Sequence, residues 1–178
     1  INNSKNQEGA TIAYRNDPFF IDPRNKELGA RGIVSLEKLY LSIKKLELKL
    51  EDPKNYYELS YNLGIAQINT KNLQEKVFGL ECNFEELNGI DFKKGCYVGQ
   101  ENTARMKLKN KLRKKLFAVK SKEKLKVGSD INYNSVKIGQ IVIDEPYPFG
   151  LIKIVDPDFS EYKDKDLLIN DSKSKIIK

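Results

Sequence analysis

Hydrophobic residues follow two different periods on either side of residue 110. Before it, apolar residues recur at three- and four-residue spacing, the spacing of an amphipathic helix, at Leu36, Leu39, Tyr40, Ile43, Leu46 and Leu50. After it, short apolar segments alternate with turn residues around 127–130, 132–134 and 146–150, which is typical of a small antiparallel barrel or sandwich. We therefore predict an α+β portion over residues 1–110 and a C-terminal β-barrel over residues 111–178.

The α+β portion should begin with three short strands, at residues 10–14, 19–21 and 30–34, because turn residues separate these apolar segments. A helix should follow them. Ser35 is placed to cap its first turn, and the helical spacing of apolar residues continues to Leu50.

Two further helices are expected before the barrel. Asp52 and Pro53 supply the N-cap and the first position of one, and Gly64 is placed to end it. A shorter helix is expected from about Gly99 to Met106. Beyond it we predict strands with three inward-facing leucines, Leu108, Leu112 and Leu116.

The composition is that of a globular chain: 178 residues, 39% hydrophobic and 32% charged, with a formal net charge of +7. The sequence contains no apolar run near the ~20 residues that a membrane span needs, so we expect no membrane partner. No apolar segment resembling a secretory signal opens the chain. The polar stretch that begins at Ile1 reads as the interior of a longer protein.

Histidine is absent, and the only cysteines are Cys82 and Cys96. The absence of histidine removes Ser–His and Cys–His catalytic dyads and every His-ligated metal site. Two cysteines cannot supply the four thiolates of a resident iron–sulfur cluster from one copy of the chain, so we predict no metal site. The scarcity of cysteine also argues against a disulfide framework and for a reducing, cytoplasmic location.

The segment Lys-Gly-Cys-Tyr-Val-Gly-Gln-Glu around Cys96 is the strongest candidate for a functional site. Two lysines precede this cysteine and a predicted helix begins shortly after it, and both features favour the reactive thiolate. Gly95 and Gly99 leave the backbone on either side free, and Gln100 and Glu101 add an amide and a carboxylate nearby. The residue chemistry alone leaves a second interpretation open, in which Cys96 is a small buried hydrophobic residue.

This segment, followed by Arg105, resembles the signature of the YgfZ-type folate-binding proteins, which are relatives of the glycine-cleavage T-protein, an aminomethyltransferase. Mitochondrial counterparts in that family serve iron–sulfur cluster assembly. Weaker matches precede it in the family's order. Residues 20–24 and 28–31 resemble a D-P-R…L-G-x-R segment, and residues 88–92 resemble the approach to the cysteine.

The resemblance implies a fold and a ligand. The fold is the body of the aminomethyltransferase-like folate-binding proteins followed by a small β-barrel, with part of the body outside this sequence. The ligand is tetrahydrofolate or a derivative. Cys96 would be the reactive thiol, with Gln100 and Glu101 beside it. The residues implied to bind the cofactor are Lys94, Gly95, Tyr97, Gly99, Arg105 and Arg31.

The function implied is that of a folate-binding accessory protein for the assembly or repair of iron–sulfur clusters, without turnover of its own. Its partners would be folate and the client or assembly proteins of those clusters. True aminomethyltransferases resemble this stretch but lack the cysteine and the Gly-Gln-Glu, so Cys96 favours the accessory role. The alternative is a tetrahydrofolate-dependent aminomethyltransferase.

Other residues have two interpretations. Asp22, Arg24 and Arg31 either form a buried ion-pair set that fixes a turn or line a pocket. Asp-Pro-Arg is good turn chemistry by itself, so for Asp22 and Arg24 we favour the structural role. Ser60 stands where relatives carry an arginine, and Cys82 matches no family position, so we interpret Cys82 as structural.

A run of cations follows the motif: Arg105, Lys107, Lys109, Lys111, Arg113, Lys114 and Lys115. The run could contact RNA or the anionic glutamate tail of folate, or it could be a solvated strand and turn. We favour the solvated surface and do not expect direct nucleic-acid binding.

Overall fold

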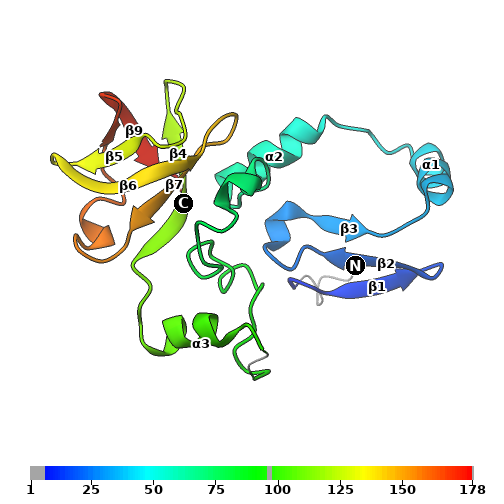
Figure 1. Ribbon diagram of the computed structural model, residues 1–178. Helices are drawn as coiled ribbons and strands as arrows, with labels where there is room; N and C mark the ends of the chain where they lie inside the picture. The colour runs from blue at the N-terminus through cyan, green and yellow to red at the C-terminus, as the bar shows by residue number, and fades with distance from the viewer. Residues whose placement is uncertain (1–6, 96–97, 178) are drawn as a thin grey trace. The chain divides into compact units, whose positions relative to one another are not determined.

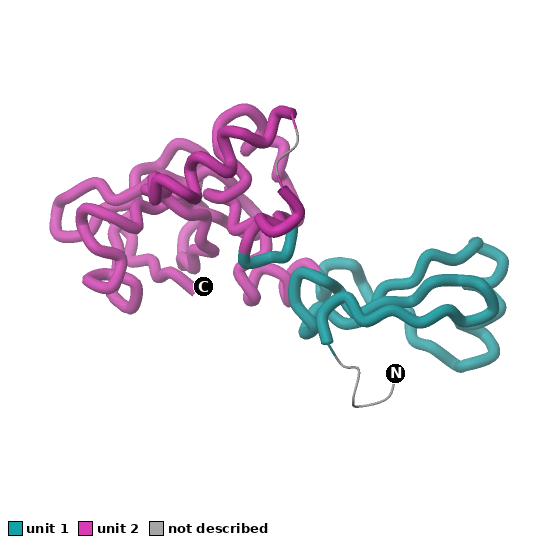
Figure 2. The backbone as a smooth tube through the Cα atoms, turned by 90° about the horizontal axis from the view of Figure 1, so that it is seen from below, with its two compact units in different colours: residues 1–56, 86–89 teal, residues 57–85, 90–178 magenta. Residues whose placement is uncertain are grey.

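The chain forms two compact units. The computed structural model describes residues 7–95 and 98–177. Unit 1 comprises residues 1–56 and 86–89, and unit 2 comprises residues 57–85 and 90–178 (Figure 2). Each unit has its own sheet, so each is described separately below.

Unit 1 is built on a three-stranded antiparallel sheet, in the order β1 (Thr11–Tyr14), β2 (Asp17–Ile21) and β3 (Ala30–Gly32) (Figure 1). These are the three strands that the sequence predicts. A short 3-10 helix, η2 (Lys26–Leu28), connects β2 to β3, and the side chain of Asn25 caps it. The register sets Phe20 of β2 opposite Arg31 of β3, which brings the start of β3 beside the turn that follows β2.

Helix α1 (Leu36–Lys45) begins where the sequence predicts, because the Ser35 hydroxyl accepts a hydrogen bond from the Lys38 amide. The predicted extension to Leu50 is wrong. Glu47 adopts a left-handed backbone conformation with φ of 51°, which no helix can continue through. The apolar spacing runs on beyond this point, but spacing records which face is apolar and not where the backbone turns.

Helix α2 (Pro53–Asn62) confirms both predicted ends. Asp52 accepts a hydrogen bond from the Lys54 amide at 2.9 Å, and Gly64 takes a left-handed φ of 74°. The Gly64 amide bonds the carbonyl of Tyr61 and the Ile65 amide bonds that of Ser60, the pattern of a Schellman cap. A 3-10 helix, η3 (Thr70–Leu73), follows in the connection to the motif.

Helix α3 (Glu101–Leu108) follows the motif and extends further than the sequence predicts. Leu108 belongs to this helix and is 85% exposed, so its expected place on an inward strand face is wrong. Asn110 then adopts a left-handed φ of 47°, and the strand begins only at Lys114. Of the three leucines, Leu116 is the one that is buried as predicted.

The C-terminal part is a closed antiparallel barrel, which confirms the predicted architecture (Figure 1). Its strands pair in the order β4-β7-β6-β5-β8-β9. They are β4 (Lys114–Ser121), β5 (Asp130–Tyr133), β6 (Val136–Ile143), β7 (Phe149–Lys153), β8 (Leu167–Ile169) and β9 (Ser172–Ile176), with a 3-10 helix, η4 (Phe159–Glu161), before β8. The chain is therefore mixed α+β, while the aminomethyltransferase-like body stays a prediction.

The barrel holds the main hydrophobic core. Its central cluster consists of fully or nearly fully buried side chains: Val119, Leu125, Ile131, Ile138, Ile141, Ile152, Tyr162, Leu167 and Ile169. A second cluster around Phe149 and Leu116 packs against residues that precede the barrel, among them Tyr61 and Cys82. Tyr61 adds a 2.7 Å hydrogen bond to the carbonyl of Val119 on β4. The segment 57–85 thus belongs physically to the barrel.

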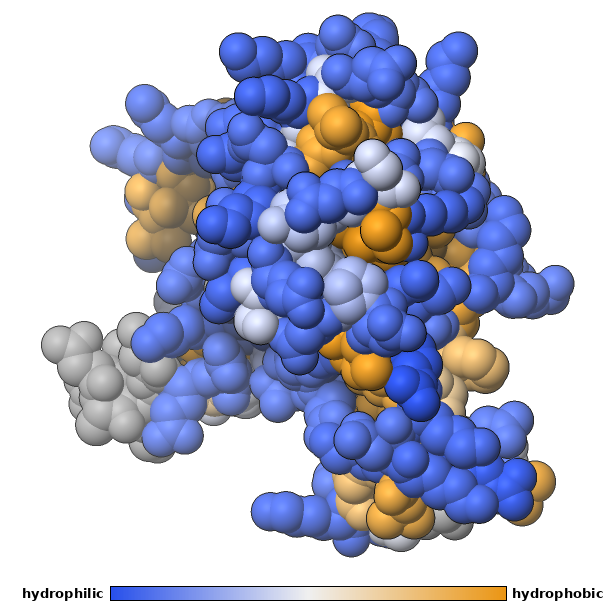
Figure 3. All heavy atoms as spheres, turned by 90° about the vertical axis from the view of Figure 1, so that its left-hand side faces the viewer, coloured by the Kyte–Doolittle hydropathy of each residue, from blue (hydrophilic) through white to orange (hydrophobic). Residues whose placement is uncertain are grey.

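The molecular face in Figure 3 is mainly hydrophilic, with small separate apolar areas. Within the described ranges, no helix has the length and apolar character needed to cross a bilayer.

Candidate functional site

The segment around the cysteine motif is exposed and locally braced. Cys96 and Tyr97 lie outside the described residues, so the roles predicted for them stay predictions. Ahead of them, Lys94 and Gly95 are exposed, and the carboxylate of Asp91 accepts the Lys93 amide at 2.8 Å. Gly95 has a φ of 87° with open space where a side chain would stand, so its requirement for glycine is torsional and not steric.

On the other side of the motif, Glu101 braces the start of α3. Its Oε2 accepts a hydrogen bond from the Gly99 amide at 2.8 Å, where Gly99 has a φ of 90°. A carboxylate here also suits the positive end of the helix dipole. Gln100 is the N-cap residue, is exposed and makes no side-chain capping bond.

The far end of α3 is attached to the approach to the motif. Lys107 bonds both carboxylate oxygens of Glu85, at 2.6 and 2.7 Å, and its Nζ lies 5.8 Å from the centre of the Phe92 ring. Phe92 therefore has a packing partner of its own, which favours a structural interpretation of this aromatic residue.

Five of the other six cations of the run are solvated, and Lys115 is half-buried. Arg105, Lys109, Lys111, Arg113 and Lys114 are exposed, and no ion pair to another described residue holds any of these five side chains. The structure thus favours the solvated interpretation of the run.

A hydrogen-bonded polar cluster around a buried carboxylate lies in unit 1. Asp22 is fully buried and accepts hydrogen bonds from the Arg24 amide, Nε and Nη2 at 2.9, 3.0 and 2.8 Å, and from Arg31 Nε at 2.6 Å. Burial alone would raise the pKa of Asp22, but these hydrogen bonds outweigh it and lower the pKa from 3.8 to about 2. The predicted ion-pair set is present, and it includes Arg31.

Tyr56 completes this cluster, and the sequence analysis missed it. Its hydroxyl oxygen accepts from Arg24 Nη2 at 3.0 Å and from Arg31 Nη2 at 2.6 Å. The available signal was a tyrosine, with its hydroxyl group, in the first turn after the Asp52 cap. In addition, the Asn88 amide group donates to the Pro23 carbonyl at 2.8 Å, which ties residues 86–89 to the same turn.

Ser60 and Cys82 have structural roles. Ser60 is fully buried and its hydroxyl donates to the Ile65 carbonyl at 2.7 Å, so it reinforces the end of α2. Cys82 packs against the Phe149 cluster, and burial, with a smaller effect from Glu81, raises the pKa of its thiol to about 11. A thiol with such a pKa stays protonated and unreactive at neutral pH.

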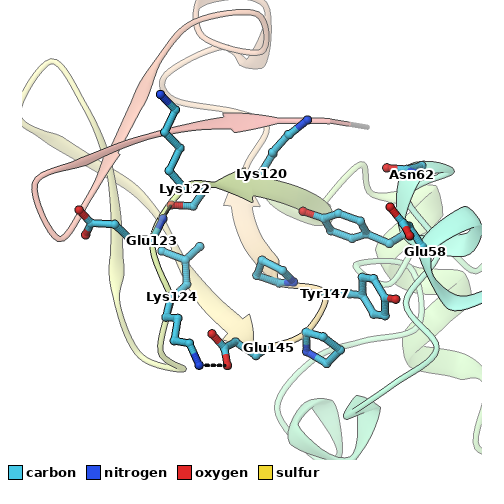
Figure 4. Close-up of a pocket in the computed structure, with 13 residues that line it drawn as sticks. Glu58, Asn62, Lys120, Lys122, Glu123, Lys124, Glu145 and Tyr147 are labelled. Carbon is cyan, nitrogen blue, oxygen red and sulfur yellow. Dashed lines mark hydrogen bonds and ion pairs between the residues drawn. The ribbon is translucent and has the colours of Figure 1, made fainter. Parts of the chain in front are cut away.

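A cavity of about 400 Å³ lies in unit 2 between the end of α2 and the barrel (Figure 4). Its aromatic wall is formed by Tyr61 and Tyr147, whose ring centres are 5.4 Å apart. Charged groups of both signs line it: Glu58, Glu123, Glu145, Lys120, Lys122 and Lys124. The Lys124–Glu145 ion pair, at 3.1 Å, neutralises part of this charge. None of the site residues predicted from the sequence lines the cavity.

Fold and site together describe an α+β chain with a terminal barrel and a cysteine segment whose described flanking residues, including Gly95 and Gly99, are exposed. No protein-family model matches the chain. Among curated proteins it is similar to the iron-sulfur cluster assembly factor IBA57 homolog, mitochondrial, of Dictyostelium discoideum, with 38% identity over 102 residues, 56% of this chain and 24% of the relative. The IBA57 factor of Mus musculus is 34% identical over 113 residues, 64% of this chain and 29% of the relative. The homolog of Mycosarcoma maydis is 33% identical over 119 residues, 64% of this chain and 27% of the relative.

The match spans less than a third of the length of each of these relatives. Their names agree with the predicted iron–sulfur assembly function but not with the predicted location. The expectation of a cytoplasmic protein is wrong, because the similar proteins are named as mitochondrial. Scarce cysteine reports only that a compartment is reducing, so it could not separate the cytoplasm from another reducing compartment.

Proposed function

We propose that this chain contributes to a mitochondrial accessory factor that assembles or repairs iron–sulfur clusters in client proteins. The observation that carries the proposal is the Lys-Gly-Cys-Tyr-Val-Gly-Gln-Glu segment, in a chain similar to proteins named as iron–sulfur cluster assembly factors. The partners would be client or assembly proteins of the same pathway.

Cys96 would act as a single thiolate that holds an iron or sulfur species in transit, since one thiolate cannot hold a resident cluster. The neighbouring lysines favour the thiolate form. Glu101 would act as a positioning residue, because its carboxylate already binds the Gly99 amide. Gln100 is exposed and would contact the partner or the cargo.

The factor would also bind tetrahydrofolate. When bound, this cofactor would carry one-carbon units. The residues assigned to this ligand are those implied by the family resemblance: Lys94, Gly95, Tyr97, Gly99, Arg105 and Arg31. Of these, Arg31 and Arg105 carry guanidinium groups that suit the carboxylates of folate.

Replacing the motif cysteine tests the proposal, and the second cysteine supplies a matched control. We expect full-length protein with Cys96→Ser to leave a mitochondrial [4Fe–4S] hydratase as inactive as in cells that lack the protein. Cys82→Ser should preserve the hydratase activity, since that thiol is partly buried with a pKa of about 11. Normal hydratase activity in the Cys96→Ser cells, with both variants at equal abundance, would sink the proposal.

The alternative, an aminomethyltransferase, makes a separate prediction. It requires full-length protein to move a one-carbon unit between tetrahydrofolate and a lipoyl carrier in vitro. Failure of this transfer, with a T-protein as the positive control, would remove the alternative and leave the accessory role intact.

A further inference from the structure

Arg24, in the turn after β2, and Arg31, on β3, have side chains that converge on one point. Arg24 and Arg31 both donate from Nη2 to the hydroxyl oxygen of Tyr56, and both donate from Nε to the carboxylate of Asp22. Two guanidinium groups are thereby held side by side. Like charges so close repel each other unless anions compensate them.

The compensation inside the cluster is incomplete. Among the described residues, Asp22 is the one carboxylate that pairs with either arginine, so these three charged side chains carry a net charge of +1. The four hydrogen bonds to Asp22 occupy its carboxylate, and its side chain is fully buried. Asp22 therefore contacts the arginines from the buried side. The solvent-facing sides of the two guanidinium groups remain for another anion.

Those sides are accessible. The Arg31 side chain is 43% exposed and that of Arg24 is 26% exposed. Among the described residues, the Nη1 atom of neither arginine has a hydrogen-bond partner. Guanidinium groups already fixed in position lose little conformational freedom when an oxyanion binds, so such a pair is preorganised for carboxylate or phosphate.

We propose that Arg24 and Arg31 form a binding site for a single carboxylate or phosphate group, with Asp22 and Tyr56 as positioning residues. The inference rests on the proposed function in one respect: the carboxylate of the glutamate tail of tetrahydrofolate is the expected ligand. A ligand group bound here would lie beside the turn to which the Asn88 side chain donates a hydrogen bond.

Calorimetric titration with three probes separates the possible sources of the anion. The probes are tetrahydrofolate, tetrahydropteroate, which lacks the glutamate, and inorganic phosphate. We expect tetrahydrofolate to bind about tenfold more tightly than tetrahydropteroate, and Arg31→Gln to abolish this difference. Arg31→Lys should recover only part of it, because an ammonium keeps the charge but not the planar fork.

Arg15→Gln is the matched control, since Arg15 is an exposed arginine of the same unit that lies over the Tyr14 ring, 5.4 Å from its centre. It should change affinity less than twofold. Equal losses in Arg15→Gln and Arg31→Gln would show that net charge alone attracts the probe and would overturn the site. If tetrahydrofolate fails to bind while phosphate binds in an Arg31-dependent way, the site stands and the folate part of the proposed function fails.

A second measurement needs no variant, which matters because Arg31→Gln could unfold unit 1. In a phosphate titration of the unaltered chain, the chemical shift of Arg31 Nε–H should change and reach a plateau. The chemical shift of Arg15 Nε–H should stay constant. No shift of the Arg31 signal up to about 20 mM phosphate would overturn the proposal.

Discussion

At the scale of single residues, Asp22 is a fully buried carboxylate that accepts four hydrogen bonds. A buried carboxylate without partners loses several kcal/mol of hydration, and it would take up a proton to avoid that loss. Here four hydrogen bonds from two arginines keep it charged. This carboxylate connects the turn after β2 to the start of β3, and the two arginines connect both to Tyr56 in the first half of α2.

The stability of unit 1 should fall in acid because of Asp22. Its pKa is lower in the folded chain, about 2, than the ordinary 3.8, so its contribution is complete above the ordinary value and is lost as pH falls through about 2. We expect a loss of at most about 2 kcal/mol, since partly exposed arginines interact less strongly than buried ones.

Amide exchange of β2 and β3 reports on unit 1 separately from the barrel and can measure this loss. Asp22→Asn should be less stable than the unaltered chain at pH 5, and the difference should shrink as pH approaches 2. A difference that does not depend on pH would contradict the assignment of the charge.

Residue chemistry predicted part of this cluster. The Asp-Pro-Arg turn made Asp22 and Arg24 recognisable as a pair, because the pairing is local. Tyr56 is 25 residues from Arg31 and 32 from Arg24, and no sequence spacing links residues so distant. The cavity could not be predicted for the same reason, because its two tyrosines are distant in the sequence. One lies on α2 and the other in the β6–β7 connection.

At the scale of elements, the sequence predicted where helices begin better than where they end. Ser35 and Asp52 announce helix starts because the capping side chain is itself the signal. Helices α1 and α3 end near Glu47 and Asn110, residues with left-handed backbones that are not glycine. Since the apolar spacing continues past both, it misplaced the end of α1 and the first strand of the barrel.

The pairing of β6 with β7 should tolerate no side chain at Gly139. A Cβ there would lie 2.6 Å from the Leu151 carbonyl oxygen and 3.0 Å from the Ile152 Cα, both backbone atoms that cannot rotate away. We expect Gly139→Ala to lower the free energy of unfolding of the barrel by about 3 kcal/mol, measured by urea denaturation.

Gly150→Ala is the control on the adjacent strand. Its Cβ would meet the Cδ1 of Ile131 at 2.5 Å, which is the far end of a side chain and not a backbone atom. The cost should therefore be about 1 kcal/mol. Equal costs at the two positions would show that steric contact with the backbone is not what requires Gly139.

At the scale of the whole molecule, the structure agrees with the sequence analysis about where positive charge is exposed to solvent. The chain carries a net charge of +7, and a dense group of its cations, within residues 105–115, is solvated. Lys107 and Lys115 are exceptions, since Glu85 neutralises Lys107 and Lys115 is half-buried. The barrel itself was predictable because its short strands and turns alternate regularly, whereas the arrangement of residues 1–56 as a separate compact unit was not.

This distribution predicts weak, salt-sensitive contact with nucleic acid. We expect a short single-stranded RNA to bind with a Kd of about 10⁻⁵ M in low salt and to show no measurable binding at physiological salt, in fluorescence anisotropy. The double variant Lys109→Glu/Lys111→Glu should lose the low-salt binding, while Lys163→Glu/Lys165→Glu, with the same charge change on the barrel, should keep most of it. Submicromolar affinity at physiological salt would reverse our expectation that nucleic acid is not a partner.

The barrel closes through β4 and β9, its first and last strands, which pair from Val119 with Ile176 to Ser121 with Ser174. During synthesis on the ribosome, β4 to β8 therefore emerge with two open sheet edges, and these edges have no partner until Ile176 has left the exit tunnel. Open edges of this kind invite pairing with other chains. A nascent chain stalled inside β9 would be a substrate for chaperones, and a premature stop codon there would cost the cell the whole barrel and not merely its final strand.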